Sequence, residues 1–211
     1  MSRMEIGLPV ERWGTPAEPE AIRQAVEALR SRGFSAEVVE DRSEALARVR
    51  ALIPDGARVM TGGTTQEQIG LKDLLTSGSI SWVNVKGEIL SEKDPEKQMA
   101  LRRMGIFSQY FVGSVHAIAK TGELVAGSAS GSQLAAYAYG AEKVILIVGA
   151  QKITESLEDG LRRLREYSTP LEDRRMKSVG YPGTVLSKIL IMERQTRPSI
   201  HVIIVNEVLG F

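Results

Sequence analysis

The sequence predicts an α/β protein with a mainly parallel sheet and helices on both faces. Short β-rich runs alternate with amphipathic helical periods along the chain, which is typical of strands joined by covering helices. The run at 143–148 is apolar enough to be buried on both faces, as a central parallel strand is. A turn of glycine and threonine at 62–65 follows a short apolar strand and opens a helix. Ligands bind beyond the carboxyl ends of strands in such sheets, so this turn marks the expected site.

Spacing and turn residues predict each element in the first third of the chain. A helix over 20–32 repeats apolar side chains at helical spacing and ends before Gly33, because glycine readily adopts the conformation that stops a helix. A strand over 36–39 comes next, followed by a helix for which Ser43 is the expected N-cap. A Pro-Asp-Gly turn at 54–56 then leads into the strand that precedes the glycine turn.

The middle third continues the alternation. The run at 80–85 is expected to be a strand, and the helix at 94–104 opens with an Asp-Pro pair, since proline is tolerated in the first helical turn. Short strands are expected at 110–113 and 123–126, and a helix of small residues at 132–139.

In the last third, the central strand precedes a helix at 156–167 whose leucines recur among charged residues. The segment 168–184 contains two prolines and two glycines and is predicted to be a loop excursion outside the core. The β-rich runs at 189–192 and 200–205 are both expected to be strands.

The composition favours one domain over residues 1–211, with 1–19 as an N-terminal lead, because 43% hydrophobic residues can build a sizeable core. With 27 basic and 26 acidic side chains, the formal charge of +1 supplies no field to attract nucleic acid. The N-terminus lacks the apolar core of a signal peptide, and no apolar run reaches membrane-spanning length. These features predict a cytoplasmic protein with no membrane or nucleic-acid partner.

The absence of cysteine excludes disulfides, thiolate metal sites, cysteine-ligated iron–sulfur clusters and a cysteine nucleophile. The two histidines, His116 and His201, have no neighbours at metal-ligand spacing, so no metal site is expected. His201 lies within an apolar strand and is interpreted as structural. The basic cluster at 174–177 is interpreted as a solvated charge run.

The turn of Gly62, Gly63, Thr64 and Thr65 is the leading candidate for a ligand site. Glycine has no Cβ, so the backbone can approach a ligand closely, and the first amides of a helix have no intrahelical partner. Phosphate or carboxylate suits such amides. The alternative is that the threonines cap the helix and the glycines only turn the chain.

Ser114, His116 and Glu123 lie close together in sequence around a predicted turn region. His116 is a candidate acid/base or anion donor because the reference pKa of histidine is near 6.5. Glu123 is the second catalytic candidate, and Ser114 is a candidate ligand contact. The alternatives are a neutral structural histidine and a solvated glutamate at a strand start.

Ser130, Gly131 and Ser132 form a second possible anion cradle immediately before a predicted helix. The alternative is that one of the two serines is an ordinary N-cap. If this turn faced the first one, the two would frame one pocket.

Five sequence blocks resemble those of the LUD domain family, which contains the LutC and YkgG lactate-utilisation proteins. The blocks occur in the family order at 62–71, 113–118, 121–125, 140–149 and 202–211. The resemblance implies a fold similar to the NagB, RpiA (ribose-5-phosphate isomerase) and CoA-transferase group, in which the glycine turn after an early strand receives anionic ligands.

The resemblance also implies a role in oxidising L-lactate to pyruvate, as a LutC-like subunit beside LutA-like and LutB-like subunits. The chain itself would bind no cofactor, and the iron–sulfur clusters would lie on the partner subunits. Two alternatives stay open. One is a stand-alone enzyme acting on a phosphosugar or acyl-CoA, with Glu123 or His116 as acid/base or nucleophile. The other is a ligand-binding module without catalysis, and a homo-oligomer is compatible with each.

Overall fold

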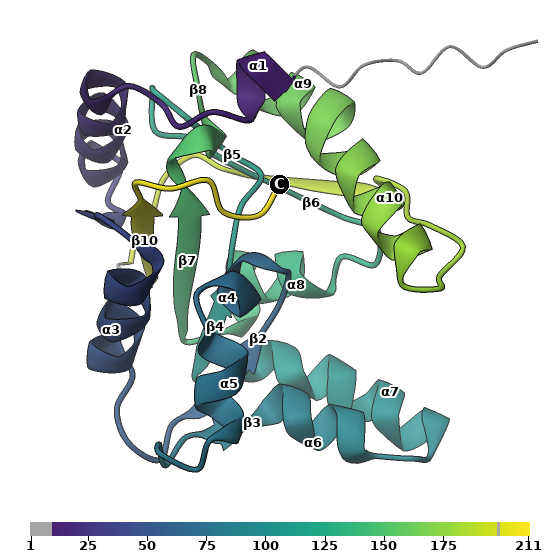
Figure 1. Cartoon of the computed structure of the whole chain (residues 1–211). Coiled ribbons are helices and arrows are strands. Elements are labelled where there is room, and N and C mark those ends of the chain that lie inside the picture. The colour runs from purple at the N-terminus through teal and green to yellow at the C-terminus, as the bar shows by residue number, and fades with distance from the viewer. Residues whose placement is uncertain (1–9, 198) are drawn as a thin grey trace, which may run out of the picture.

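The main sheet of the protein has six parallel strands in the order β1-β10-β7-β4-β2-β3 (Figure 1). The computed structural model describes residues 10–197 and 199–211. The strands of this sheet are β1 Ser35–Val39, β2 Arg58–Thr61, β3 Val83–Asn84, β4 Tyr110–Gly113, β7 Lys143–Gly149 and β10 Ile200–Val205. All register pairs run in the same direction, which confirms the predicted fold class.

Strand β7 is the centre of the sheet, as its apolar run predicts. It pairs with β10 on one side and β4 on the other. Val144 and Leu146 pack into one hydrophobic cluster, and Ile145 and Ile147 pack into a second. Because side chains alternate along a strand, both faces of β7 are buried.

Helices cover both faces of this sheet. Buried side chains of α2 (Pro19–Ser31) belong to the first cluster, and those of α3 (Arg42–Leu52) belong to the second. The other helices are α1 Val10–Trp13, α4 Thr65–Gln68, α5 Leu71–Thr76, α6 Val85–Ser91, α7 Pro95–Met104, α8 Ser132–Ala135, α9 Leu157–Arg163 and α10 Thr169–Ser178. Short 3-10 segments η1 Gly105–Phe107 and η3 Ala150–Lys152 and π segments η2 Ala136–Gly140 and η4 Leu164–Ser168 complete the set.

A second sheet, which the sequence pattern does not distinguish, has the order β8-β5-β6-β9. Its strands are β5 Ala117–Ala119, β6 Leu124–Ser128, β8 Ile153–Thr154 and β9 Lys188–Met192. Strand β6 pairs antiparallel with both neighbours, whereas β5 and β8 are parallel. The predicted strand at 189–192 therefore exists but belongs to this sheet and not to the main one.

Two predicted segments are wrong. The loop excursion at 168–184 is largely the helix α10, because Pro170 lies in the first turn, where proline is tolerated. The strand predicted at 80–85 is only β3, and a helix begins at Val85, capped by the side chain of Asn84.

Two helices also differ from the prediction, one in its N-cap and one in its continuity. The N-cap of α3 is Asp41, whose carboxylate accepts from the N–H groups of Ser43 and Glu44, so Ser43 is not the cap. The helix expected after the glycine turn is divided into α4 and α5 at Gly70, which has a φ of 81°. Across the described ranges, no helix combines the length and apolar character needed to cross a membrane.

Candidate functional site

The site lies where three neighbouring parallel strands end. Strands β7, β4 and β2 are adjacent in the sheet and point the same way, so the residues that follow them meet at one edge. The glycine turn follows β2, Ser114 follows β4, and Lys152 lies three residues beyond β7. The sheet order therefore brings together groups that are far apart in sequence.

A cavity of about 290 Å³ opens at this edge. Among its lining residues are Gly62, Gly63, Thr64, Thr65, Ser114, His116, Gly127, Ser128, Ser130, Gln133, Lys152, Glu172, Met176 and Phe211. The two turns predicted as anion cradles therefore do face the same cavity.

Gly131 and Ser132 lie next to the cavity lining and shape it indirectly. Gly131 has a φ of 88° and is itself the N-cap position of α8, so neither serine is the cap. The N–H of Ser132 donates to Ser130 Oγ at 3.3 Å, which fixes the turn that presents Ser130 to the cavity.

Glu123 lies outside this cavity. Its carboxylate pairs with Arg32 at 2.5 Å and accepts a hydrogen bond from Thr121. The structure therefore does not bring Glu123 together with His116 at the cavity. His201 is a structural residue, as expected from its strand, because its Nε2 is 2.6 Å from the carboxylate of Glu37.

Lys152 is the candidate site residue that sequence reasoning missed, and it lines the cavity. Its side chain is only 2% exposed, and its Nζ donates to Ser114 Oγ at 3.0 Å and to Thr65 Oγ1 at 3.3 Å. Among the described residues, no carboxylate pairs with it. Burial lowers the pKa of Lys152 well below its usual range, and the nearby charge of Arg163 adds to this shift.

His116 presents an uncharged ring to the cavity. Its Nδ1 accepts a hydrogen bond from the N–H of Gly127 at 3.0 Å. Burial, followed by the charges of Lys152 and Arg163, lowers the pKa of His116 to about 3. At neutral pH the ring proton is therefore on Nε2, which makes His116 a hydrogen-bond donor and not a cation.

Replacing His116 with asparagine is expected to flatten the dependence of stability on pH between about 3 and 6.5. In the wild-type chain the folded-state pKa lies below the unfolded value, so the unfolded state binds more protons in this window. Stability therefore rises with pH there, by at most about 1.4 kcal/mol for each pH unit. Urea unfolding at a series of pH values measures the slope. Equal slopes for the wild-type chain and the variant would contradict the lowered pKa of His116.

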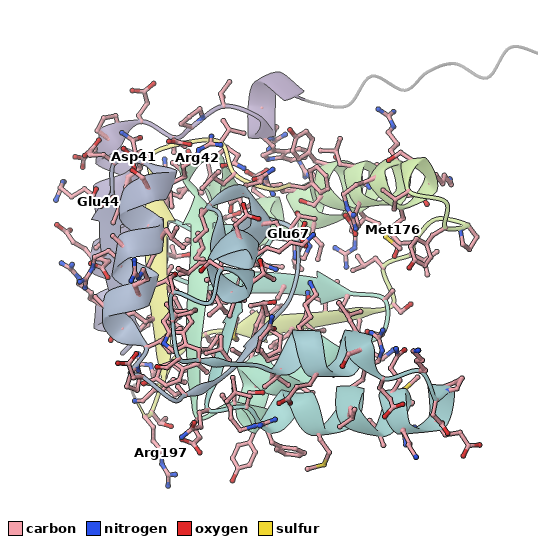
Figure 2. The ribbon with its side chains drawn as sticks, turned by 60° about the horizontal axis from the view of Figure 1, so that its bottom comes forward. Asp41, Arg42, Glu44, Glu67, Met176 and Arg197 are labelled. Atoms are coloured by element: carbon pink, nitrogen blue, oxygen red, sulfur yellow. The ribbon has the colours of Figure 1, made fainter. Side chains whose placement is uncertain are left out.

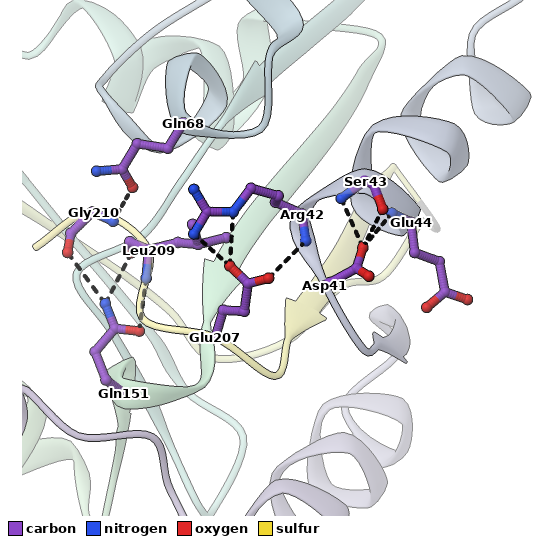
Figure 3. A network of polar contacts seen from close by, with 9 residues as sticks. All are labelled: Asp41, Arg42, Ser43, Glu44, Gln68, Gln151, Glu207, Leu209 and Gly210. Atoms are coloured by element: carbon purple, nitrogen blue, oxygen red, sulfur yellow. Dashed lines mark hydrogen bonds and ion pairs between the residues drawn. The ribbon is translucent and has the colours of Figure 1, made fainter.

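The C-terminal segment is held against the site by a polar network (Figure 3). The buried amide of Gln151 donates to the backbone oxygens of Leu209 and Gly210 at 2.9 and 3.2 Å, and Gln68 Oε1 accepts from the N–H of Gly210 at 2.6 Å. A Cβ at Gly210 would lie 2.3 Å from Thr65 Oγ1 and 3.0 Å from Lys152 Nζ. Only glycine permits this approach.

Helix α10 supplies the opposite wall through Glu172 and Met176. Arg175 binds the Glu172 carboxylate with hydrogen bonds of 2.6 and 2.7 Å, which offsets its negative charge at the cavity. Figure 2 labels Met176 on α10 and Glu67 on α4. The carboxylate of Glu67 is near enough to Arg175 to interact with it electrostatically. The helix that the sequence prediction missed is therefore part of the site.

The fold and the site define an α/β protein with a polar cavity at the carboxyl edge of a parallel sheet. The chain belongs to the LUD domain family, whose model matches residues 22–205. At the level of the family, this supports a role related to lactate utilisation. Within the described residues, no group of three or more histidine, aspartate or glutamate side chains is arranged to hold a metal ion.

One similar solved structure is a crystal structure of a DUF162 family protein from Deinococcus radiodurans. It shares 12% sequence identity and aligns with a TM-score of 0.52, over 90% of this chain and 100% of that one. At this identity the likeness supports the fold alone. No curated protein matches the chain.

Proposed function

We propose that the chain is a LutC-like subunit of a system that oxidises L-lactate to pyruvate, and that it binds a small carboxylate in the cavity. LutA-like and LutB-like subunits would carry the iron–sulfur clusters and the electron transfer, since this chain has no cysteine. Membership of the LUD family supports the lactate-related role, and the chemistry of the cavity supports the carboxylate.

The observation that carries the proposal is a set of hydrogen-bond donors on residues that line the cavity. Among the described residues, no hydrogen bond engages the N–H groups of Gly63, Thr64 and Thr65. The hydroxyl of Ser114 and the amine of Lys152 lie beside them. The free amides match the acceptor oxygens of a carboxylate, and Ser114 and Lys152 complete the polar lining around them.

The helix dipoles contribute little to this site. Helices α4 and α8 have four residues each, too short to carry the partial charge of a long helix. The affinity for an anion should therefore come from the backbone amides of the glycine turn. The cavity volume of about 290 Å³ suits a small organic acid better than a whole coenzyme.

Binding and reconstitution experiments together test this function. Thermal unfolding of the purified chain is expected to shift upward with L-lactate or pyruvate, because a ligand that binds only the native state stabilises it. Inorganic phosphate and a neutral sugar are the comparison ligands. Adding the chain to its LutA-like and LutB-like partners is expected to increase dye-linked lactate oxidation. No thermal shift, together with oxidation that is indifferent to the chain, would refute the proposal.

Replacing Gly63 with alanine is expected to weaken carboxylate binding by about tenfold. Gly63 has a φ of 95°, where a side chain strains the backbone, so the turn and its amides would move. The matched control is Gly56→Ala, which has a φ of 76°, with no other heavy atom within 4 Å of an added Cβ. Both variants should lose about 1 kcal/mol of stability. Calorimetric titration should show weaker binding only for Gly63→Ala, and equal affinities would contradict the site.

A further inference from the structure

We propose that Lys152 forms an imine with the carbonyl carbon of a short 2-oxo carboxylate bound in this cavity. The inference rests on the proposed carboxylate site and goes beyond it, because it gives the site a covalent step and a preference for 2-oxo over 2-hydroxy acids. It is carried by the hydrogen bonds of the amine, its electrostatic surroundings and the position of the anion-binding turn.

The hydrogen bonds of Lys152 fit a neutral amine. Nζ has two acceptors, Ser114 Oγ at 3.0 Å and Thr65 Oγ1 at 3.3 Å. A neutral amine has two N–H groups and one lone pair, so these two acceptors satisfy its donors and leave the lone pair for an electrophile. An ammonium has three donors, and the described residues offer no acceptor for the third.

The surroundings of the amine also favour its neutral form. The charged and titratable side chains that act on Lys152 are Arg163, which is cationic, and His116, which is uncharged at neutral pH. Glu172 lines the same cavity, but Arg175 holds its carboxylate. Burial and the charge of Arg163 both lower the pKa of Lys152, which is the usual way in which a lysine becomes a nucleophile.

The cavity places an anion site next to this amine. Thr65 belongs to the glycine turn and also accepts the hydrogen bond from Lys152, so the two groups adjoin. In a 2-oxo acid the carbonyl carbon is bonded directly to the carboxylate. A carboxylate held by the turn amides would therefore present its carbonyl carbon to Nζ.

The step balances without any oxidant or reductant. The lone pair of Nζ forms a bond to the carbonyl carbon, and one amine proton passes to the carbonyl oxygen to give a carbinolamine. That hydroxyl then leaves with a second proton as water, and the C=N bond forms. Ser114 Oγ lies in contact with Nζ and can relay the protons. A 2-hydroxy acid has no carbonyl at this carbon, so L-lactate would bind without forming the bond.

Reductive trapping tests the inference. The full-length chain is incubated with pyruvate and sodium cyanoborohydride, then measured by intact mass spectrometry and peptide mapping. We expect one reduced adduct, located on Lys152, and no adduct with L-lactate. Lys152→Arg keeps N–H donors but cannot form an imine, so it should give no adduct. The matched control is Lys188→Arg, at a lysine that donates to Ala129 O at 3.3 Å beside the cavity, and it should react as the wild type does.

Parallel calorimetric titrations with pyruvate and L-lactate separate the two proposals. Binding of both acids without an adduct on Lys152 would overturn the imine and leave the carboxylate site intact. An adduct spread over exposed lysines, or one that persists in Lys152→Arg, would also overturn the imine. Absence of both binding and adduct would overturn the proposed function together with the inference. An adduct on Lys152 in a chain that does not bind L-lactate would support the imine and count against the lactate assignment.

Discussion

Replacing Lys152 with methionine is expected to stabilise the fold while it weakens the binding of pyruvate. Lys152 is buried without a carboxylate partner among the described residues, so the chain bears the cost of keeping an amine away from water. Methionine has a similar length and no such cost. We expect the free energy of unfolding at neutral pH to rise by about 1–2 kcal/mol. Affinity for pyruvate, which the proposed imine would hold, should fall at least about tenfold.

The gain in stability should depend on pH in a defined direction. The pKa of Lys152 is lower in the folded chain than in the unfolded one, so between these two values the unfolded state binds more protons. Stability of the wild-type chain therefore rises with pH in that window. The advantage of Lys152→Met should be largest at low pH and shrink as the pH approaches the ordinary lysine value near 10.4.

Urea unfolding and calorimetric titration of both chains measure the two effects of Lys152→Met. The matched control is Lys120→Met, because Lys120 lies outside the cavity and pairs at 2.5 Å with the exposed Glu155. That pair should contribute less than about 1 kcal/mol, and its loss should leave ligand affinity unchanged. A methionine variant that is less stable than the wild type, or that binds pyruvate equally well, would contradict the role given to Lys152.

Replacing Arg163 with methionine is expected to cost about 3 kcal/mol or more of stability. The Arg163 side chain is fully buried, and its guanidinium donates to the backbone oxygen of His116, to Ser168 Oγ and to the backbone oxygen of Trp13. It also stacks 5.1 Å from the ring centre of Tyr167. Methionine would fill part of the volume but leave three acceptors without a donor.

The neighbouring Arg162 provides the control for Arg163. Its side chain is 52% exposed and is 4.0 Å from Glu166, so Arg162→Met should change stability by less than about 0.5 kcal/mol. Loss of the Arg163 charge should also raise the pKa of His116, because that charge lowers it in the wild-type chain. Denaturant unfolding and NMR titration of the His116 ring measure these effects. Equal stability of the two variants would contradict the stabilising role given to the hydrogen bonds of Arg163.

Much of the fold could be predicted because local patterns agree with the tertiary structure. The run at β7 is apolar on both faces, and it is the central strand; Gly33 ends α2 with a φ of 83°. The helix α10 could not be predicted in this way because it has no buried residue and therefore no apolar stripe. The second sheet was missed since two of its pairings, β5 with β8 and β6 with β9, join strands that are distant in sequence, and period alone does not specify partners.

The candidate site could be predicted in its turns but not in its most informative side chain. The composition of the turn at 62–65 indicates a ligand site, and all four of its residues line the cavity. Lys152 gives no local signal, because its burial depends on the order of β7, β4 and β2 in the sheet. The available hint was its position three residues after the most apolar strand, at the edge where ligands bind.

A crystal structure of the chain with L-lactate will show whether the cavity is a carboxylate site. Our proposals predict that the lactate carboxylate lies within hydrogen-bonding distance of the N–H groups of Gly63 to Thr65, with Lys152 Nζ beside it. An empty cavity at saturating lactate, or lactate bound elsewhere on the chain, would contradict the proposed function.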